Sequence, residues 1–119
     1  MAASLLTPLA QQPALAAEGP VVRIAELEID PAQLDAYKVA VKEGIETAVR
    51  VEPGVLAIYS VAVEGHPTSL RFLEIYASEA AYEAHIQSAH FQKYFQATKN
   101  MITARTLIRT DPVILEAKH

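Results

Sequence analysis

The sequence predicts an α+β domain with the element order β-α-β-β-α-β, the split βαβ arrangement. Residues 21–29 alternate as a strand does, and residues 34–49 then carry apolar side chains at steps of three and four. Two more apolar strands, 55–64 and 70–77, follow one another with a turn-rich segment between them. A second helical region and a last strand over residues 103–109 complete a four-stranded antiparallel sheet with the helices on one face.

The composition restricts the kind of protein. The chain has 119 residues, a net charge of −4 and no cysteine, so one domain is expected and disulfide or thiol chemistry is excluded. Nucleic-acid binding asks for a basic surface, which this acidic chain does not offer. No stretch approaches the roughly 18 consecutive apolar residues of a membrane-spanning helix. We therefore expect a globular domain over residues 20–119, with no nucleic-acid partner and no membrane span.

Residues 1–19 differ from the rest of the chain, because they hold one charge, Glu18, and no sustained helical period. Ala14-Leu15-Ala16 fits the small-x-small pattern that precedes signal-peptidase cleavage, although no positively charged n-region comes before it. Two interpretations stay open. If residues 1–16 are a signal remnant, the protein is periplasmic or secreted; if residues 1–19 are only a flexible tail, it is cytoplasmic.

The first strand and the helix that follows it have clear boundary residues. Asp30 is suited to cap the helix and Pro31 to occupy its first position, where a missing N–H costs nothing. Glu52-Pro53-Gly54 ends the helix, since proline disfavours helical backbone in the residue before it. Strand alternation predicts one face with Arg23, Ala25, Leu27 and Ile29, and another with Val22, Ile24, Glu26 and Glu28.

The second half of the chain begins with a hairpin whose loop is predicted at Gly65-His66-Pro67-Thr68. Ser78 is a helix N-cap, and Ser88 offers a second cap further along. This spacing predicts two helical pieces, 79–87 and 89–99, with a kink between them.

Both faces of the two middle strands are apolar, which two helices cannot cover. The uncovered face would form a large apolar patch, and soluble monomers avoid such patches. Sheet-to-sheet homodimerisation is the simplest way to bury it. The side chains expected at that interface are Leu56, Ile58, Leu73 and Ile75, with Val55, Ala57, Val61 and Phe72 as the alternative if the helices take the other face.

Residues 74–95 concentrate polar, titratable and aromatic side chains more than any other stretch. The run contains Glu74-Ile75-Tyr76, then Ser78-Glu79-x-Ala81-Tyr82, then His85-x-x-Ser88-x-His90-Phe91-x-x-Tyr94-Phe95. It resembles the antibiotic biosynthesis monooxygenase (ABM) domain family, and most of all its small quinol-monooxygenase-like branch. The likeness covers about residues 21–112.

This resemblance implies a ferredoxin-like α+β fold, a homodimer that joins its sheets as a dimeric α/β barrel, and a pocket between sheet and helices in each subunit. It also implies a cofactor-independent monooxygenase that oxidises a quinol-like or polyphenolic aromatic with O₂, using neither metal nor flavin. The implied partners are a small aromatic substrate, O₂ and a second copy of the chain. A non-catalytic dimeric binding module with the same fold and pocket is the alternative.

A related branch of the family degrades haem with a tryptophan and a haem-ligating histidine on this helix. Alignment on Ser78 and Ser88 places His85 at the tryptophan position and Phe95 at the ligand position. The chain contains no tryptophan at all. Haem degradation is therefore not expected.

His85 is the candidate catalytic residue. Oxidation of a phenol or hydroquinone by O₂ needs a base that produces an electron-rich oxyanion, and an imidazole titrates near neutral pH. The alternative is a structural histidine at a helix edge, hydrogen-bonded to backbone or water.

Six further residues are candidates for contact with the substrate. For the aromatic ones, plain core packing is the alternative. For the histidine, it is a structural role near the second cap. The glutamate is either a partly buried carboxylate that pairs with a histidine or an arginine, or a solvated edge residue. The six are Tyr76, Glu74, Phe72, Tyr59, His90 and Phe91.

A metal site is not expected from residue spacing. His85 and His90 lie about 140° apart around a straight helix and lack the i,i+4 spacing of a helical metal pair. Glu83 and His85 likewise occupy different helix faces.

Overall fold

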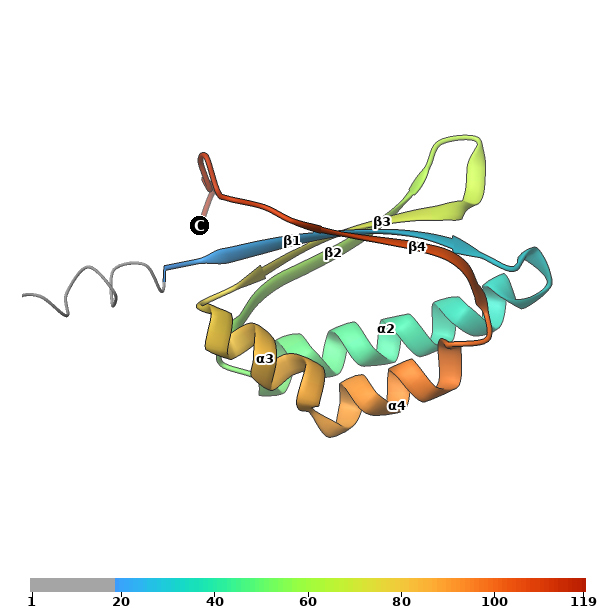
Figure 1. Ribbon diagram of the computed structural model, residues 1–119, viewed down its shortest axis with the longest axis horizontal. Helices are drawn as coiled ribbons and strands as arrows, with labels where there is room; N and C mark the ends of the chain where they lie inside the picture. The colour runs from blue at the N-terminus through green and yellow to red at the C-terminus, as the bar shows by residue number, and fades with distance from the viewer. Residues whose placement is uncertain (1–18) are drawn as a thin grey trace, which may run out of the picture.

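The computed structural model describes residues 19–119, and Figure 1 shows a four-stranded antiparallel sheet with the helices on one side of it. The predicted α+β class, the element order and the ferredoxin-like fold are confirmed. The strand order is β2-β3-β1-β4. The elements are β1 (Val21–Ile29), the 3-10 turn η1 (Pro31–Gln33), α2 (Leu34–Val51), β2 (Val55–Val63), β3 (His66–Tyr76), α3 (Glu79–Gln87), α4 (Ala89–Thr98) and β4 (Ile102–Arg109).

The interpretations of the N-terminal tail and of the compartment fall outside the described residues, apart from Gly19. Within residues 19–119, none of the helices has the length and apolar character needed to cross a membrane.

The central strand β1 leads the chain into α2. Its burial alternates as predicted, with Ala25, Leu27 and Ile29 packed into the core beneath the helices. The Asp30 side chain accepts a hydrogen bond from the backbone N of Ala32 at 3.0 Å, so the predicted cap is present. This cap begins the 3-10 turn η1, and the α-helix itself starts after that turn, at Leu34.

The segment that follows α2 lies directly against the start of α3. Gly54 has so little room that a Cβ at this position would lie 2.6 Å from the Cβ of Ala81. Its carbonyl accepts a hydrogen bond from the backbone N of Ala77 at 2.8 Å. These contacts bring Glu52, which follows α2, next to the second helical region.

Strand β2 contains a bulge that changes its alternation. The register with β3 shifts between Val55 and Ala57, so one residue is inserted at Leu56. Ile58 consequently pairs with Glu74 and lies on the helix side of the sheet, where it packs against the core. The prediction of Ile58 at the uncovered face is therefore wrong, because strict alternation from Leu56 ignored this extra residue.

The hairpin between β2 and β3 is tighter than predicted. Val63 pairs with His66, and Gly65 adopts a left-handed φ of 78°, which closes the turn with two residues. The predicted loop over residues 65–68 is thus wrong for its last three positions. Pro67 is tolerated in β3 because it pairs with neither neighbouring strand. Pairing with β1 ends at Ser69, and the register with β2 shifts between Ala62 and Val63, so that no β2 residue lies opposite Pro67.

The second helical region is broken at Ser88, as predicted. The Ser78 hydroxyl caps α3 by accepting from the backbone N of Ala81, and the Ser88 hydroxyl caps α4 by accepting from the backbone N of Phe91. Ser88 itself has an extended backbone (φ −67°, ψ 152°). The chain therefore turns between the two helices, and α4 starts in a new direction (Figure 1).

The sheet face opposite the helices carries exposed apolar side chains. No helix of residues 19–119 covers it (Figure 1). Cross-strand pairs place Tyr59 with Leu73 and Ala57 with Ile75 on this face. We call it the open face, and its exposed large apolar residues are Tyr59, Val61, Leu73 and Ile108.

Candidate active site

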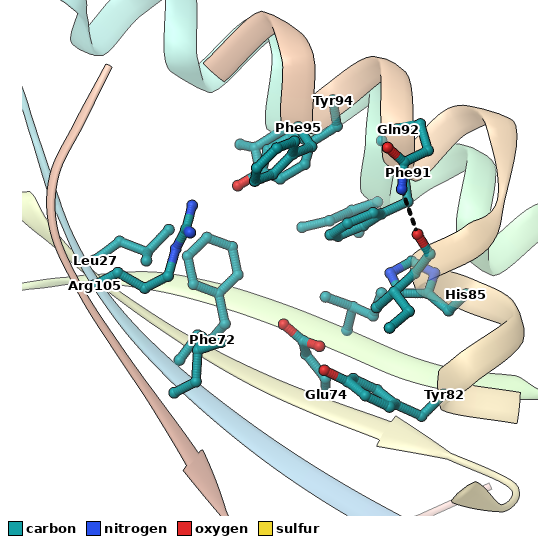
Figure 2. A pocket seen from close by; sticks show the side chains of 17 residues that line it. Leu27, Phe72, Glu74, Tyr82, His85, Phe91, Gln92, Tyr94, Phe95 and Arg105 are labelled. Carbon is teal, nitrogen blue, oxygen red and sulfur yellow. Dashed lines mark hydrogen bonds between the residues drawn. The ribbon is translucent and has the colours of Figure 1, made fainter. Parts of the chain in front are cut away.

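A pocket of about 410 Å³ lies between the helix side of the sheet and the segment α3–α4 (Figure 2). Most of its lining is aliphatic or aromatic, and a few polar groups interrupt it. Phe72 and Glu74 rise from β3, while Phe91, Tyr94 and Phe95 descend from α4. The remaining polar or aromatic lining side chains are Tyr82, His85, Gln92 and Arg105.

His85 stands in the last turn of α3 and forms part of the pocket wall (Figure 2). The ring is buried between two aromatic neighbours, with centroids 5.4 Å from Tyr76 and 5.2 Å from Phe91. Its Nδ1 lies 2.8 Å from Oε2 of Glu52. The imidazole is thus held on one side by a carboxylate and flanked by aromatic rings.

The same carboxylate oxygen also binds the second histidine. His90 Nε2 lies 2.5 Å from Oε2 of Glu52. On a straight helix the two histidines would point in different directions, but the extended backbone of Ser88 separates their helices. Both rings can therefore meet one residue, which the chain supplies from the end of α2.

Glu52 remains ionised in this environment. Burial acts to raise the pKa of its carboxyl, but the hydrogen bonds from His85 and His90 and the attraction to their charge outweigh that effect. The pKa therefore stays below its ordinary value.

The ionised carboxylate determines where His85 carries its proton. A carboxylate only accepts, so neutral His85 must donate from Nδ1–H, and Nε2 keeps its lone pair. Nε2 has no hydrogen-bond partner in the described part of the chain. In that part every fully buried side-chain N or O atom has a partner, so Nε2 is not fully buried. Nε2 is therefore accessible, in a residue that lines the pocket.

Three tyrosines lie in or behind the wall of the pocket, and each of them has a hydrogen-bond partner. The fully buried Tyr76 donates its hydroxyl to Oε1 of Glu74 at 2.6 Å, and burial together with this carboxylate raises the pKa of the phenol. Tyr94 lines the pocket and shares a hydrogen bond of 2.7 Å with Tyr37. Burial raises the pKa of both these phenols as well, so all three tyrosines remain neutral at physiological pH.

Arg105 lies on β4, the edge strand of the sheet, and supplies a positive charge to the pocket. It comes from β4, lines the cavity and lies with its guanidinium 5.8 Å from the ring centroid of Phe95. Among residues 19–119 it forms no salt bridge with a carboxylate. Its charge is therefore available to a ligand.

The predicted site residues fall into three groups. His85, Phe72, Glu74 and Phe91 line the pocket. Tyr76 and His90 lie behind its wall, in contact with Glu74 and Glu52 respectively. Tyr59 is 60% exposed on the open face, because it pairs with Leu73 and points away from the helices. We therefore leave Tyr59 out of the candidate site.

Sequence reasoning missed two functional candidates, Glu52 and Arg105. The sequence identifies Glu52 only as part of a helix end, and nothing in its local pattern indicates a histidine partner. Arg105 had a weak signal, since it alternates with Leu107 in the last strand and both line the pocket.

Glu52, His85 and His90 also form a group with metal-ligating atoms. One atom from each residue lies within 4.8 Å of the others. The spacing of the two histidines excludes a metal site only if both lie on one straight helix. The helix is broken at Ser88, and the third group comes from the end of α2, so the spacing does not exclude a metal site here.

The fold and pocket define a small α+β protein with an aromatic-lined ligand site. The family model for antibiotic biosynthesis monooxygenases matches residues 20–97, and the chain belongs to this family. The resemblance of residues 74–95 is thereby confirmed at family level, and so is the assignment to a class of monooxygenases. Comparison with curated proteins gives no match.

Solved structures agree with this assignment. The chain is similar to an inferred antibiotic biosynthesis monooxygenase from Bacteroides thetaiotaomicron, with 42% identity and a TM-score of 0.81 over 85% of this chain and 96% of that one. An inferred monooxygenase from Lactobacillus acidophilus has 27% identity and a TM-score of 0.74, over 77% of this chain and 45% of that one. A relative from Caulobacter crescentus supports the fold. It has 21% identity and a TM-score of 0.77, over 82% of this chain and 93% of that one.

The ionised state of Glu52 predicts a pH dependence of stability. A carboxyl whose folded pKa is below its unfolded value stabilises the fold above that unfolded value, near 4.5, and this contribution is lost as pH falls through the folded pKa. Between about pH 5 and pH 3, Glu52→Gln should therefore lose less unfolding free energy than the wild type. Urea unfolding at several pH values measures this.

The exposed Glu83 provides the matched control, since Glu83→Gln on α3 should keep the wild-type pH profile. If Glu52→Gln lost as much unfolding free energy as the wild type when the pH falls, Glu52 would not have the lowered pKa described here.

Proposed function

We propose that this protein is a cofactor-independent monooxygenase that oxidises a quinol-like or polyphenolic aromatic with O₂, using His85 as the base. The observation that carries the proposal is the Glu52–His85 pair, which leaves the second imidazole nitrogen without a hydrogen-bond partner among the described residues, in a side chain that lines an aromatic-rich pocket. Membership of the monooxygenase family supports the reaction class.

The pocket suits a planar aromatic ligand. Its volume of about 410 Å³ lies in the usual range for small-molecule sites, and its lining is mainly apolar. Phe72, Phe91 and Phe95 provide ring surfaces on opposite sides of the cavity (Figure 2). Aromatic rings in such positions contact a ligand by stacking or edge-to-face packing. A quinol would therefore fit with its hydroxyl near a polar group.

His85 begins the reaction by taking the proton of the substrate hydroxyl on Nε2. The imidazolium that forms is stabilised by Glu52, whose negative charge is already in place on the Nδ1 side. Arg105 carries a positive charge in the same cavity and can stabilise the substrate oxyanion. Proton removal makes the ring electron-rich enough to reduce O₂.

The oxyanion then passes one electron to O₂, which gives a substrate radical and superoxide. These combine at a ring carbon that bears hydrogen, and the new C–O bond forms a peroxide that recovers the proton held by His85. Loss of the ring hydrogen as a proton breaks the O–O bond. One oxygen stays as a quinone carbonyl and the other leaves with the two protons as water, so the substrate supplies every electron.

Replacement of the base tests this mechanism. His85→Ala should lower turnover of a hydroquinone by about a hundredfold or more, because general base catalysis contributes that much. The wild-type rate should rise with pH as the imidazole loses its proton, and the mutant should lack this rise. Oxygen uptake with a panel of hydroquinones measures both effects.

The exposed His66 in the β2–β3 hairpin is the control, since His66→Ala removes an imidazole that does not line the pocket. A fully active His85→Ala variant would exclude the base role. No uptake by the wild type with any hydroquinone would favour the non-catalytic binding module instead.

We propose further that the protein is a homodimer joined through the open face. The support is the set of exposed apolar side chains that no helix of the described region covers, namely Tyr59, Val61, Leu73 and Ile108. Burial of such a patch provides the main driving force for association. Ile58 takes no part, because the bulge turns it to the helix side.

A charge on the open face should separate the subunits. Leu73→Arg, with Val61→Arg as a second variant, should convert a dimer to a folded monomer, since an unpaired charge is costly to bury. Light scattering combined with circular dichroism distinguishes dissociation from unfolding. Val39→Arg on the exposed side of α2 should leave the dimer intact. A wild-type monomer at micromolar concentration would contradict the proposal.

A further inference from the structure

Three side chains from three helix ends converge on one point beside the pocket. Glu52 follows α2, His85 lies in the last turn of α3, and His90 lies in the first turn of α4. The two ring nitrogens lie 2.8 Å and 2.5 Å from the same carboxylate oxygen, and the three atoms are within 4.8 Å of one another. Within residues 19–119 no other three His, Asp or Glu side chains form such a group.

This donor set matches the preference of divalent first-row transition metals. Imidazole nitrogen suits Zn²⁺, Fe²⁺, Co²⁺ and Ni²⁺, and one carboxylate completes a three-ligand set that leaves room for a further ligand. Metal–ligand bonds of about 2.1 Å place neighbouring ligand atoms roughly 3 Å apart or slightly more. The observed contacts need only a small expansion to admit an ion.

The three ligands are buried and positioned before any ion arrives. Their side chains are only 14% (Glu52), 9% (His85) and 18% (His90) exposed. Ser88 fixes the joint between the two histidines, because its hydroxyl donates to the carbonyl of His85 at 2.7 Å and accepts from the backbone N of Phe91. Little conformational freedom therefore remains to be lost on binding.

Binding requires few changes of protonation. The Glu52 carboxyl is already ionised. Each neutral histidine carries one proton, which can move to its other ring nitrogen when the metal takes the nitrogen facing Glu52. In His85 the proton would move from Nδ1 to Nε2. Among the described residues no group forms a hydrogen bond with Nε2, so this nitrogen is free to take the proton. An ion can thus replace the two hydrogen bonds without deprotonating either ring.

We propose that Glu52, His85 and His90 bind one divalent transition-metal ion per chain, and that the bound ion switches off the base. With a metal on Nδ1, His85 carries its proton on Nε2 and cannot accept one from a substrate. The inhibitory consequence rests on the proposed function, whereas the binding site does not. The ion therefore competes with the active arrangement of the Glu52–His85 pair.

Metal binding is measured directly on the full-length, untagged protein after removal of metals with a chelator. Titration calorimetry with ZnCl₂ should show one ion per chain, and Co²⁺ should produce a visible absorption band. His90→Gln and Glu52→Gln should each weaken Zn²⁺ binding by about tenfold or more, since the loss of even an outer partner costs that much. His66→Ala should bind as the wild type does. Equal binding by the wild type and by both ligand variants would overturn the site.

Activity provides the second arm of the experiment. With a hydroquinone that the metal-free protein oxidises, Zn²⁺ should lower the rate with a midpoint equal to the calorimetric Kd. In His90→Gln, inhibition relative to its own metal-free rate should need about tenfold more Zn²⁺. A rate that is unchanged or increased by bound metal contradicts the switch. If no hydroquinone reacts, the proposed function fails, and calorimetry still decides the metal site.

Discussion

One carboxylate, that of Glu52, determines the arrangement of the candidate active site, because a single oxygen accepts hydrogen bonds from both His85 and His90. A buried charge is tolerated only when it is paired, and here two imidazoles provide the pairing. The pairing also selects the nitrogen on which His85 is protonated, and so leaves a free lone pair in a residue of the pocket wall. The proposed base and the proposed metal site are two uses of this one contact, and they exclude each other.

The fold positions this contact through a few local features. The close approach of Gly54 to Ala81 ties the segment after α2 to α3, which brings Glu52 within reach of the histidines. The extended backbone at Ser88 divides the second helical region, so that His85 and His90 can face the same carboxylate. On the other side of the cavity, the bulge at Leu56 turns Ile58 towards the pocket. Each feature departs from regular secondary structure at the place where the site needs it.

Local signals in the sequence predicted the fold well. The caps at Asp30, Ser78 and Ser88 depend on hydrogen bonds between near neighbours, and all three are present. The site was predictable only in part, since Glu52 meets its histidines across 33 and 38 residues of chain, and no periodic pattern encodes such a contact. The bulge was missed for a similar reason, because an inserted residue is defined by the partner strand. This error misplaced Ile58, while Tyr59 was selected for its aromatic character alone.

The protonation state of His85 tests the central claim most directly. Nitrogen-15 NMR of the metal-free protein, at a pH where the imidazole is neutral, distinguishes the two tautomers by the chemical shifts of the ring nitrogens. The account predicts that His85 carries its proton on Nδ1 and that Nε2 is unprotonated, with this preference weakened in Glu52→Gln. A proton found on Nε2 in the wild type would contradict it, since the base would then have no lone pair to offer the substrate.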